Sequence, residues 1–145
     1  MGNEKLNEGT KQFLRDVFGY NDEQIKIIES NPKWLKGIKA GPIMMSKKMV
    51  ATCVKAQNCS MNVVGDRYVF TAHGTLLKDE TCKRPCLWAM AQFLPFSYML
   101  YDRVISGLDP NDMCTDHVPC PDVGCEYGGV GTAIFKITVE DMPIP

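Results

Sequence analysis

The chain has 145 residues, of which 45% are hydrophobic and 23% charged, and its formal net charge is −1. These values are typical of one folded globular domain. Because the charges nearly balance, composition gives no reason to expect nucleic acid or an anionic membrane surface as a partner. No run approaches the roughly 18 apolar residues of a spanning helix, so we expect no membrane either.

The first 47 residues predict a helical N-terminal extension. Side chains that share one helix face recur at a spacing of 3.6 residues before Gly19, which suits a C-terminal cap. They are Leu6, Thr10, Phe13, Leu14, Val17 and Phe18. Asn21 can cap a second helix, Asn31-Pro32 can begin a third, and Gly41-Pro42 is expected to end the helical part.

Residues 48–145 predict a cysteine-containing α+β core in the same single domain. Residues 49–55, 67–72 and 133–139 are rich in β-branched and aromatic residues and read as strands. Residues 87–105 are long and apolar enough for a helix, which Pro95 should kink or divide. We therefore expect a small antiparallel sheet packed on one long helix, together with a Cys/Gly-rich loop at residues 106–131.

The expected long helix is rich in aromatic residues. Spacing predicts that they pack into the core, and a ligand pocket lined by them is the alternative. These residues are Trp88, Phe93, Phe96, Tyr98 and Tyr101.

The seven cysteines are the main chemical feature of the sequence. The polar start of the chain lacks the apolar region of a signal peptide, so we expect a cytoplasmic location, where thiols stay reduced. An odd number also prevents complete pairing within one chain. Short spacings of reduced cysteines favour metal ligands, and the candidates are Cys59, Cys82, Cys86, Cys114, Cys120 and Cys125. Cys53 lies in a strand pattern and is expected to be a buried core residue.

Two segments bring candidate ligands close together in sequence. Cys82 and Cys86 stand at the entry to the predicted long helix, where the helix dipole and nearby basic residues favour a thiolate. The loop at residues 114–125 supplies three more sulfurs, and His117 could add an imidazole. Four sulfurs would complete a tetrahedral zinc site or hold a [4Fe–4S] cluster: Cys59, Cys86, Cys120 and one of Cys82, Cys114 or Cys125. The alternative is a set of unlinked, partly buried thiols.

Three short motifs resemble those of a small uncharacterised family of bacterial and archaeal proteins, many from anaerobes. They are Cys59 with Gly65-Asp66, Cys86-Leu87-Trp88-Ala89, and Cys120-Pro121-Asp122 before a final strand. The resemblance covers about residues 50–139. It singles out Cys59, Cys86 and Cys120 as shared positions and implies no activity.

Three hypotheses about function follow from the cysteines. The first is a small metal or iron–sulfur protein that transfers electrons or serves as an accessory subunit to a redox or enzyme partner protein. The second is a small-molecule enzyme that uses a reactive cysteine and an aromatic-lined pocket. The third is an interaction module with structural zinc.

Overall fold

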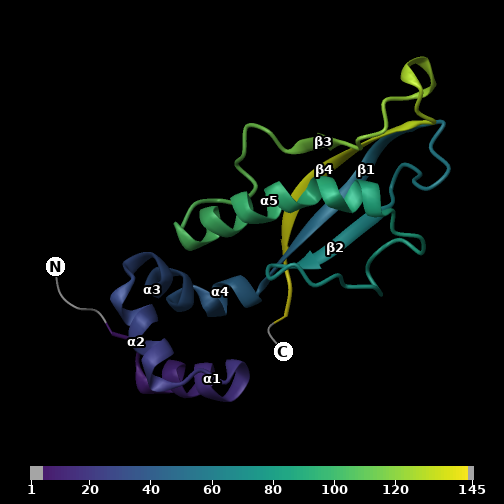
Figure 1. The fold of residues 1–145 in the computed structure, drawn as a ribbon. Coiled ribbons are helices and arrows are strands. Elements are labelled where there is room, and N and C mark those ends of the chain that lie inside the picture. Colours follow the sequence, from purple (N-terminus) through teal and green to yellow (C-terminus); the bar gives the residue numbers. More distant parts are fainter. Residues whose placement is uncertain (1–4, 144–145) are drawn as a thin grey trace. The chain divides into compact units, whose positions relative to one another are not determined.

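The computed structural model describes residues 5–143. The chain divides into two compact units between Pro42 and Ile43. The first unit is helical and the second combines helix with sheet (Figure 1). Each has its own cluster of buried apolar side chains. The two units are therefore described separately.

Capped helices form the N-terminal unit: α1 (Glu8–Phe18), α2 (Asp22–Ser30) and α3 (Pro32–Lys39). Gly19 ends α1 with a left-handed φ of 68°, as expected from the sequence. Asn21 and Gln24 form a capping box at the start of α2, and Asn31 caps α3. Local hydrogen bonds thus fix where each helix begins, and the helices enclose a small core of Leu6, Leu14, Ile28 and Leu35.

Two details of this region differ from the sequence prediction. Gly41-Pro42 does not end the helical part, because α4 (Gly41–Met45) begins there. Proline suits the first turn of a helix, because the backbone N–H groups there have no partner within the helix and the one that proline lacks is not needed. Within the predicted face of α1, Leu14 is buried but Phe13, Val17 and Phe18 are exposed.

The second unit contains a four-stranded antiparallel sheet with strand order β2-β1-β4-β3. The strands are β1 (Lys47–Gln57), β2 (Arg67–Thr71), β3 (His117–Pro119) and β4 (Thr132–Asp141). A bulge between Cys53 and Lys55 shifts the pairing of β1 with β4. The α+β fold class predicted from the sequence is confirmed.

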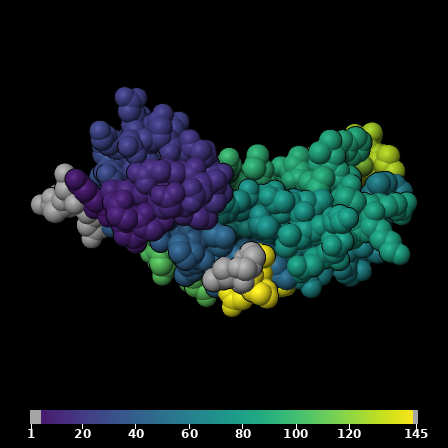
Figure 2. All heavy atoms as spheres, turned by 90° about the horizontal axis from the view of Figure 1, so that it is seen from below, coloured from purple at the N-terminus to yellow at the C-terminus, as the bar shows by residue number. Residues whose placement is uncertain are grey.

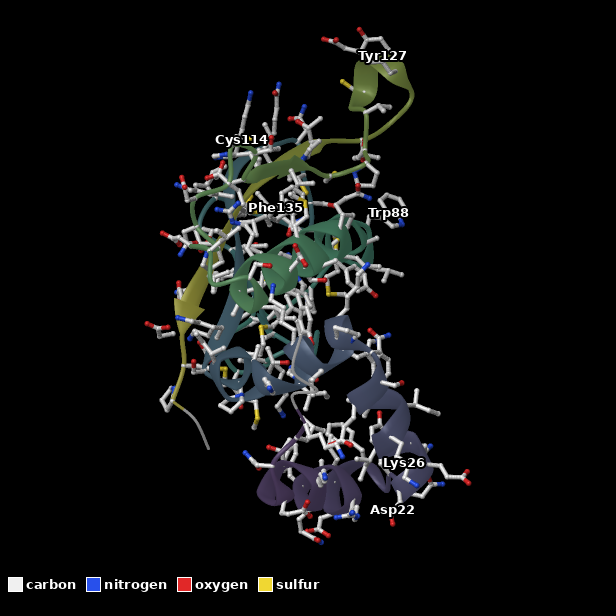
Figure 3. The ribbon with its side chains drawn as sticks, turned by 90° about the vertical axis from the view of Figure 1, so that its left-hand side faces the viewer. Asp22, Lys26, Trp88, Cys114, Tyr127 and Phe135 are labelled. Carbon is white, nitrogen blue, oxygen red and sulfur yellow. The ribbon has the colours of Figure 1, made fainter. Side chains whose placement is uncertain are left out.

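One long helix, α5 (Leu87–Ile105), packs along one face of the sheet (Figure 1). Alternate residues of β1, namely Met49, Ala51 and Cys53, point into the core beneath it. The centre of this core is an aromatic cluster with rings edge to face: Phe93 lies 5.3 Å from Tyr68 and 5.1 Å from Phe135, between ring centroids. Figure 3 shows Phe135 pointing inward from β4.

Three expectations for α5 and the following loop need correction. Pro95 lies inside α5 without dividing it. The loop at residues 106–131 contains β3 and a short 3₁₀ helix, η1 (Cys125–Tyr127). Of the five aromatic residues of the helix, only Phe93 and Phe96 are buried, whereas Trp88, Tyr98 and Tyr101 are exposed. These residues lie on more than one face of the helix, so the five together line no single pocket.

The aromatic cluster makes Phe93 the residue whose truncation should cost most. Phe93→Ala removes a ring that is 1% exposed and leaves a cavity between helix and sheet. We expect a loss of about 3–5 kcal/mol in the free energy of unfolding, measured by urea titration. Tyr127→Ala removes a ring that is 79% exposed and should change stability by less than about 0.5 kcal/mol. Equal effects of the two substitutions would contradict the assigned core.

Candidate thiolate site

The buried hydroxyl of Tyr68 is the centre of a hydrogen-bonded group at the start of α5. Tyr68 is fully buried, and its hydroxyl donates to the side-chain oxygen of Asn62, which is 2% exposed. The same hydroxyl accepts the backbone N–H of Cys86 at 3.1 Å. Burial raises the pKa of Tyr68 well above its usual value, so the hydroxyl keeps its proton and remains a donor.

The side chain of Asn62 connects the Tyr68 hydroxyl with the sulfur of Cys59. Because its oxygen accepts from Tyr68, its NH₂ group faces Cys59, with Nδ2 3.6 Å from Sγ. The backbone N–H groups of Met61 and Asn62 also point at this sulfur, the latter at 3.3 Å. Burial alone raises the pKa of the Cys59 thiol, but these N–H donors outweigh it and the pKa is lowered. These donors thus stabilise the thiolate form of Cys59.

Cys82 and Cys86 approach the same tyrosine from the segment before α5. The N–H of Cys82 donates to the carbonyl of Arg67 at 2.8 Å, which holds this segment against β2. The Cys82 sulfur interacts with the Tyr68 hydroxyl and with the backbone N–H of Arg84, although burial is the larger effect and raises its pKa. Cys86 is the N-terminal cap residue of α5, and its side chain makes no capping hydrogen bond. Figure 2 shows the middle of the chain, in teal, at the surface of the second unit.

Cys120 follows β3 and is held against β4. Its N–H donates to the carbonyl of Ala133 at 2.9 Å, and its sulfur accepts the N–H of Asp122 at 3.3 Å. The carboxylate of Asp122 in turn accepts backbone N–H groups of the loop, from Gly124 at 2.9 Å, Val130 at 3.0 Å and Gly131 at 3.3 Å. The Gly124 N–H makes the largest contribution to a lowered Asp122 pKa, which partial desolvation opposes. One carboxylate therefore organises the loop.

Gly131 brings this loop against the turn that carries Cys59. A Cβ atom at position 131 would lie 2.4 Å from the carbonyl oxygen of Asn58 and 2.7 Å from the backbone nitrogen of Cys59. Only a residue without a side chain permits such an approach of two backbones. The segments of Cys59 and Cys120 are consequently neighbours, although 61 positions separate these cysteines in the sequence.

The remaining cysteines differ in their surroundings. Cys53 is buried, as its strand position predicted, in the same core as Tyr68, and its thiol donates to the carbonyl of Lys55 at 3.4 Å. Cys114 and Cys125 are exposed, and Figure 3 shows Cys114 at the surface. His117 Nδ1 pairs with Asp116 at 2.6 Å. Within residues 5–143, no three His, Cys, Asp or Glu side chains form a group that could hold a metal ion.

Sequence reasoning singled out the cysteines but missed the residues that orient them. Asn62 and Tyr68 have no role in the sequence prediction, and Asp122 entered it only as part of a motif. The available signal was the position of Asn62, three residues after Cys59, where a side chain can return to the sulfur across a turn. Nothing in the local pattern indicates that Tyr68 pairs with it.

Comparisons with known proteins give no independent identification of this site. No family model, curated protein or solved structure matches the chain. Among helices of the described residues, none is long and apolar enough to cross a membrane. The geometry of the second unit is therefore what indicates a function.

Asp122 provides a test of the loop through its charge. Its lowered pKa means that its contribution to folding is present above about pH 4, the usual pKa of an unfolded Asp, and is lost as pH falls through the folded value. Hydrogen exchange at Val130 and Gly131, corrected for intrinsic rates, should accelerate in that acid range. In Asp122→Asn, exchange should be faster already at pH 7 and show no such acid step. Wild-type protection in the variant would contradict this role.

Gly131 provides a second test, through its close approach to the Cys59 turn. Gly131→Ala places a methyl group against two backbone atoms, and we expect a loss of about 1–3 kcal/mol in the free energy of unfolding. Amide exchange at Asn62, which donates to Cys59, should accelerate as the turn is displaced. Gly41→Ala is the control, because no atom lies within 4 Å of the added carbon. Unchanged exchange at Asn62 in Gly131→Ala would show that the contact does not position the turn.

Proposed function

We propose that the second unit is a cysteine-ligated metal or iron–sulfur protein whose ligands are Cys59, Cys82, Cys86 and Cys120. One observation carries the proposal: two of these sulfurs each accept a backbone N–H at 3.3 Å from the turn that follows them. Asn62 donates to Cys59, and Asp122 donates to Cys120.

This repeated turn has a chemical consequence. An N–H group directed at sulfur stabilises negative charge there, and metals bind the thiolate rather than the thiol. Hydrogen bonds to ligating sulfurs also set the reduction potential of iron–sulfur clusters. The segments of Cys59 and Cys120 share the arrangement and are neighbours at Gly131, which favours a common purpose over two unrelated turns.

The hydrogen-bonded group also favours Cys82 as the fourth ligand. Its sulfur interacts with Tyr68, whose hydroxyl contacts both Asn62 beside Cys59 and the N–H of Cys86. The other two candidates, Cys114 and Cys125, are exposed, and the Cys114 sulfur lies beside the Thr115 hydroxyl at 3.9 Å. A loaded site would require the four sulfurs to stand about 3.5–4 Å apart, given Zn–S bonds of about 2.3 Å, so metal binding would draw their segments together.

Electron transfer or an accessory role beside a redox or enzyme partner protein is the function we favour for such a centre. Structural zinc in an interaction module is the other use of the same ligands. Absorbance near 400 nm, roughly where sulfur-to-iron charge transfer falls, would distinguish a cluster from zinc. Both uses require bound metal.

Metal content is the direct test of the proposed function. We expect protein purified without oxygen to contain zinc, or iron with sulfide, by elemental analysis. Cys59→Ser and Cys120→Ser should lose most of it, because serine is a poor ligand for these metals. Cys114→Ser is the matched control and should retain the wild-type content. Protein that remains metal-free after reconstitution with zinc, or with iron and sulfide, would overturn the proposal.

A reactive-cysteine enzyme is the second candidate, favoured by the environment of Cys59 alone. Its lowered pKa and partial exposure suit a nucleophilic thiol. The aromatic-lined pocket expected for this enzyme has less support, because Tyr98 and Trp88 point to solvent. Metal-free protein in which Cys59 alkylates much faster than every other thiol would favour this candidate over the metal centre.

A further inference from the structure

The outer face of α5 is apolar although it is exposed. No charged residue occurs between Leu87 and Tyr101, so the helix is hydrophobic on all sides. Its inner face is buried against the sheet through Ala89, Phe93, Phe96, Leu100 and Val104. A helix of this composition is normally covered on every side in a water-soluble protein. Figure 3 shows Trp88, at the start of the helix, pointing away from the second unit.

The exposed residues of this outer face have the spacing of a helix–helix interface. They follow one another at intervals of four, three, four and three residues, which is the repeat of a coiled-coil seam. We call them the α5 seam: Leu87, Ala91, Leu94, Tyr98 and Tyr101. Leu87 is 72% exposed, Leu94 59% and Tyr98 70%. The surface is thus shaped to receive another helix with a matching apolar seam.

We propose that the α5 seam is a dimer interface, on which α5 of a second copy of this chain packs antiparallel. A second copy supplies a partner helix with the same repeat and the same freedom from charge. A two-fold axis near the middle of α5, close to Pro95, would place equal seams against each other in one closed interface. The proposal is independent of the metal centre.

Charges at the two ends of the helix select the antiparallel arrangement. Lys83 and Arg84 are exposed just before α5 begins, and Asp102 is exposed near its end, where the neighbouring Arg103 donates to the carbonyl of Asp109. Antiparallel packing brings the basic end of one helix beside the acidic end of the other, and it also opposes the helix dipoles favourably. Parallel packing would instead bring like charges together.

The exposed apolar area of α5 supplies most of such an interface. Aromatic side chains bury roughly 150–250 Å² each when fully covered, so the exposed fractions of the seam and of neighbouring Trp88 and Met99 leave on the order of 600 Å² per chain. A standard interface buries about 800 Å² per partner, and contacts of the flanking loops would add the difference. Exposed apolar patches of this size generally mark interaction sites.

Substitution of the seam residue Tyr98 tests the dimer in the full-length chain. We expect wild-type protein to sediment as a dimer, and Tyr98→Glu to raise the dissociation constant by about tenfold or more, because it buries a charge in an apolar interface. Tyr127→Glu makes the same change at a ring that is 79% exposed outside α5, and it should leave the dimer intact. Far-UV circular dichroism, unchanged in both variants, would establish that they fold.

Charge exchange tests the antiparallel arrangement. Asp102→Lys should weaken the dimer, and adding Lys83→Glu and Arg84→Glu in the same chain should restore it. Wild-type protein that is monomeric across the concentration range would overturn the dimer, as would a dimer that survives Tyr98→Glu. A triple variant no tighter than Asp102→Lys alone would overturn the antiparallel pairing.

Discussion

Burial of the Tyr68 hydroxyl is the constraint on which the arrangement of the second unit depends. A hydroxyl removed from water costs free energy unless its hydrogen bonds are replaced inside the protein. Here the replacements come from two different segments, the Asn62 side chain in the turn between β1 and β2 and the Cys86 N–H at the start of α5. The tyrosine ring itself packs on Phe93 and Phe135 in the core. The same residue therefore fixes the helix on the sheet and positions two of the candidate ligands.

Asp122 and Gly131 hold the long loop, residues 106–131, in its conformation. The loop has few large apolar residues, so burial alone would not offset the loss of its conformational freedom. The Asp122 carboxylate gathers three backbone N–H groups, and Gly131 allows the loop to contact the turn of Cys59. Hydrogen bonds to one charged group and one close backbone contact thus help to order the loop.

The two faces of α5 have similar side chains but different surroundings. One face packs on the sheet with aromatic and aliphatic side chains, whereas the other presents residues of similar character to solvent. Cys86 stands at the beginning of this helix, so any partner on the outer face would lie near one candidate ligand.

Local chemistry in the sequence determined much of the fold but little of the site. Capping residues such as Asn21 and Gly19 act on neighbouring backbone groups, and alternation in β4 reflects one buried face, so these elements and the α+β class could be predicted. The α4 helix, the short β3 strand and the continuity of α5 through Pro95 depend on packing that a local pattern does not contain. The exposure of Tyr98 and the pairing of Tyr68 with Asn62 likewise depend on which segments meet. The sequence by itself determined which cysteines lie in turns and at a helix start, where a sulfur can serve as a ligand. Only the tertiary structure decided which of them share a hydrogen-bonded group, because residues distant along the chain supply the donors.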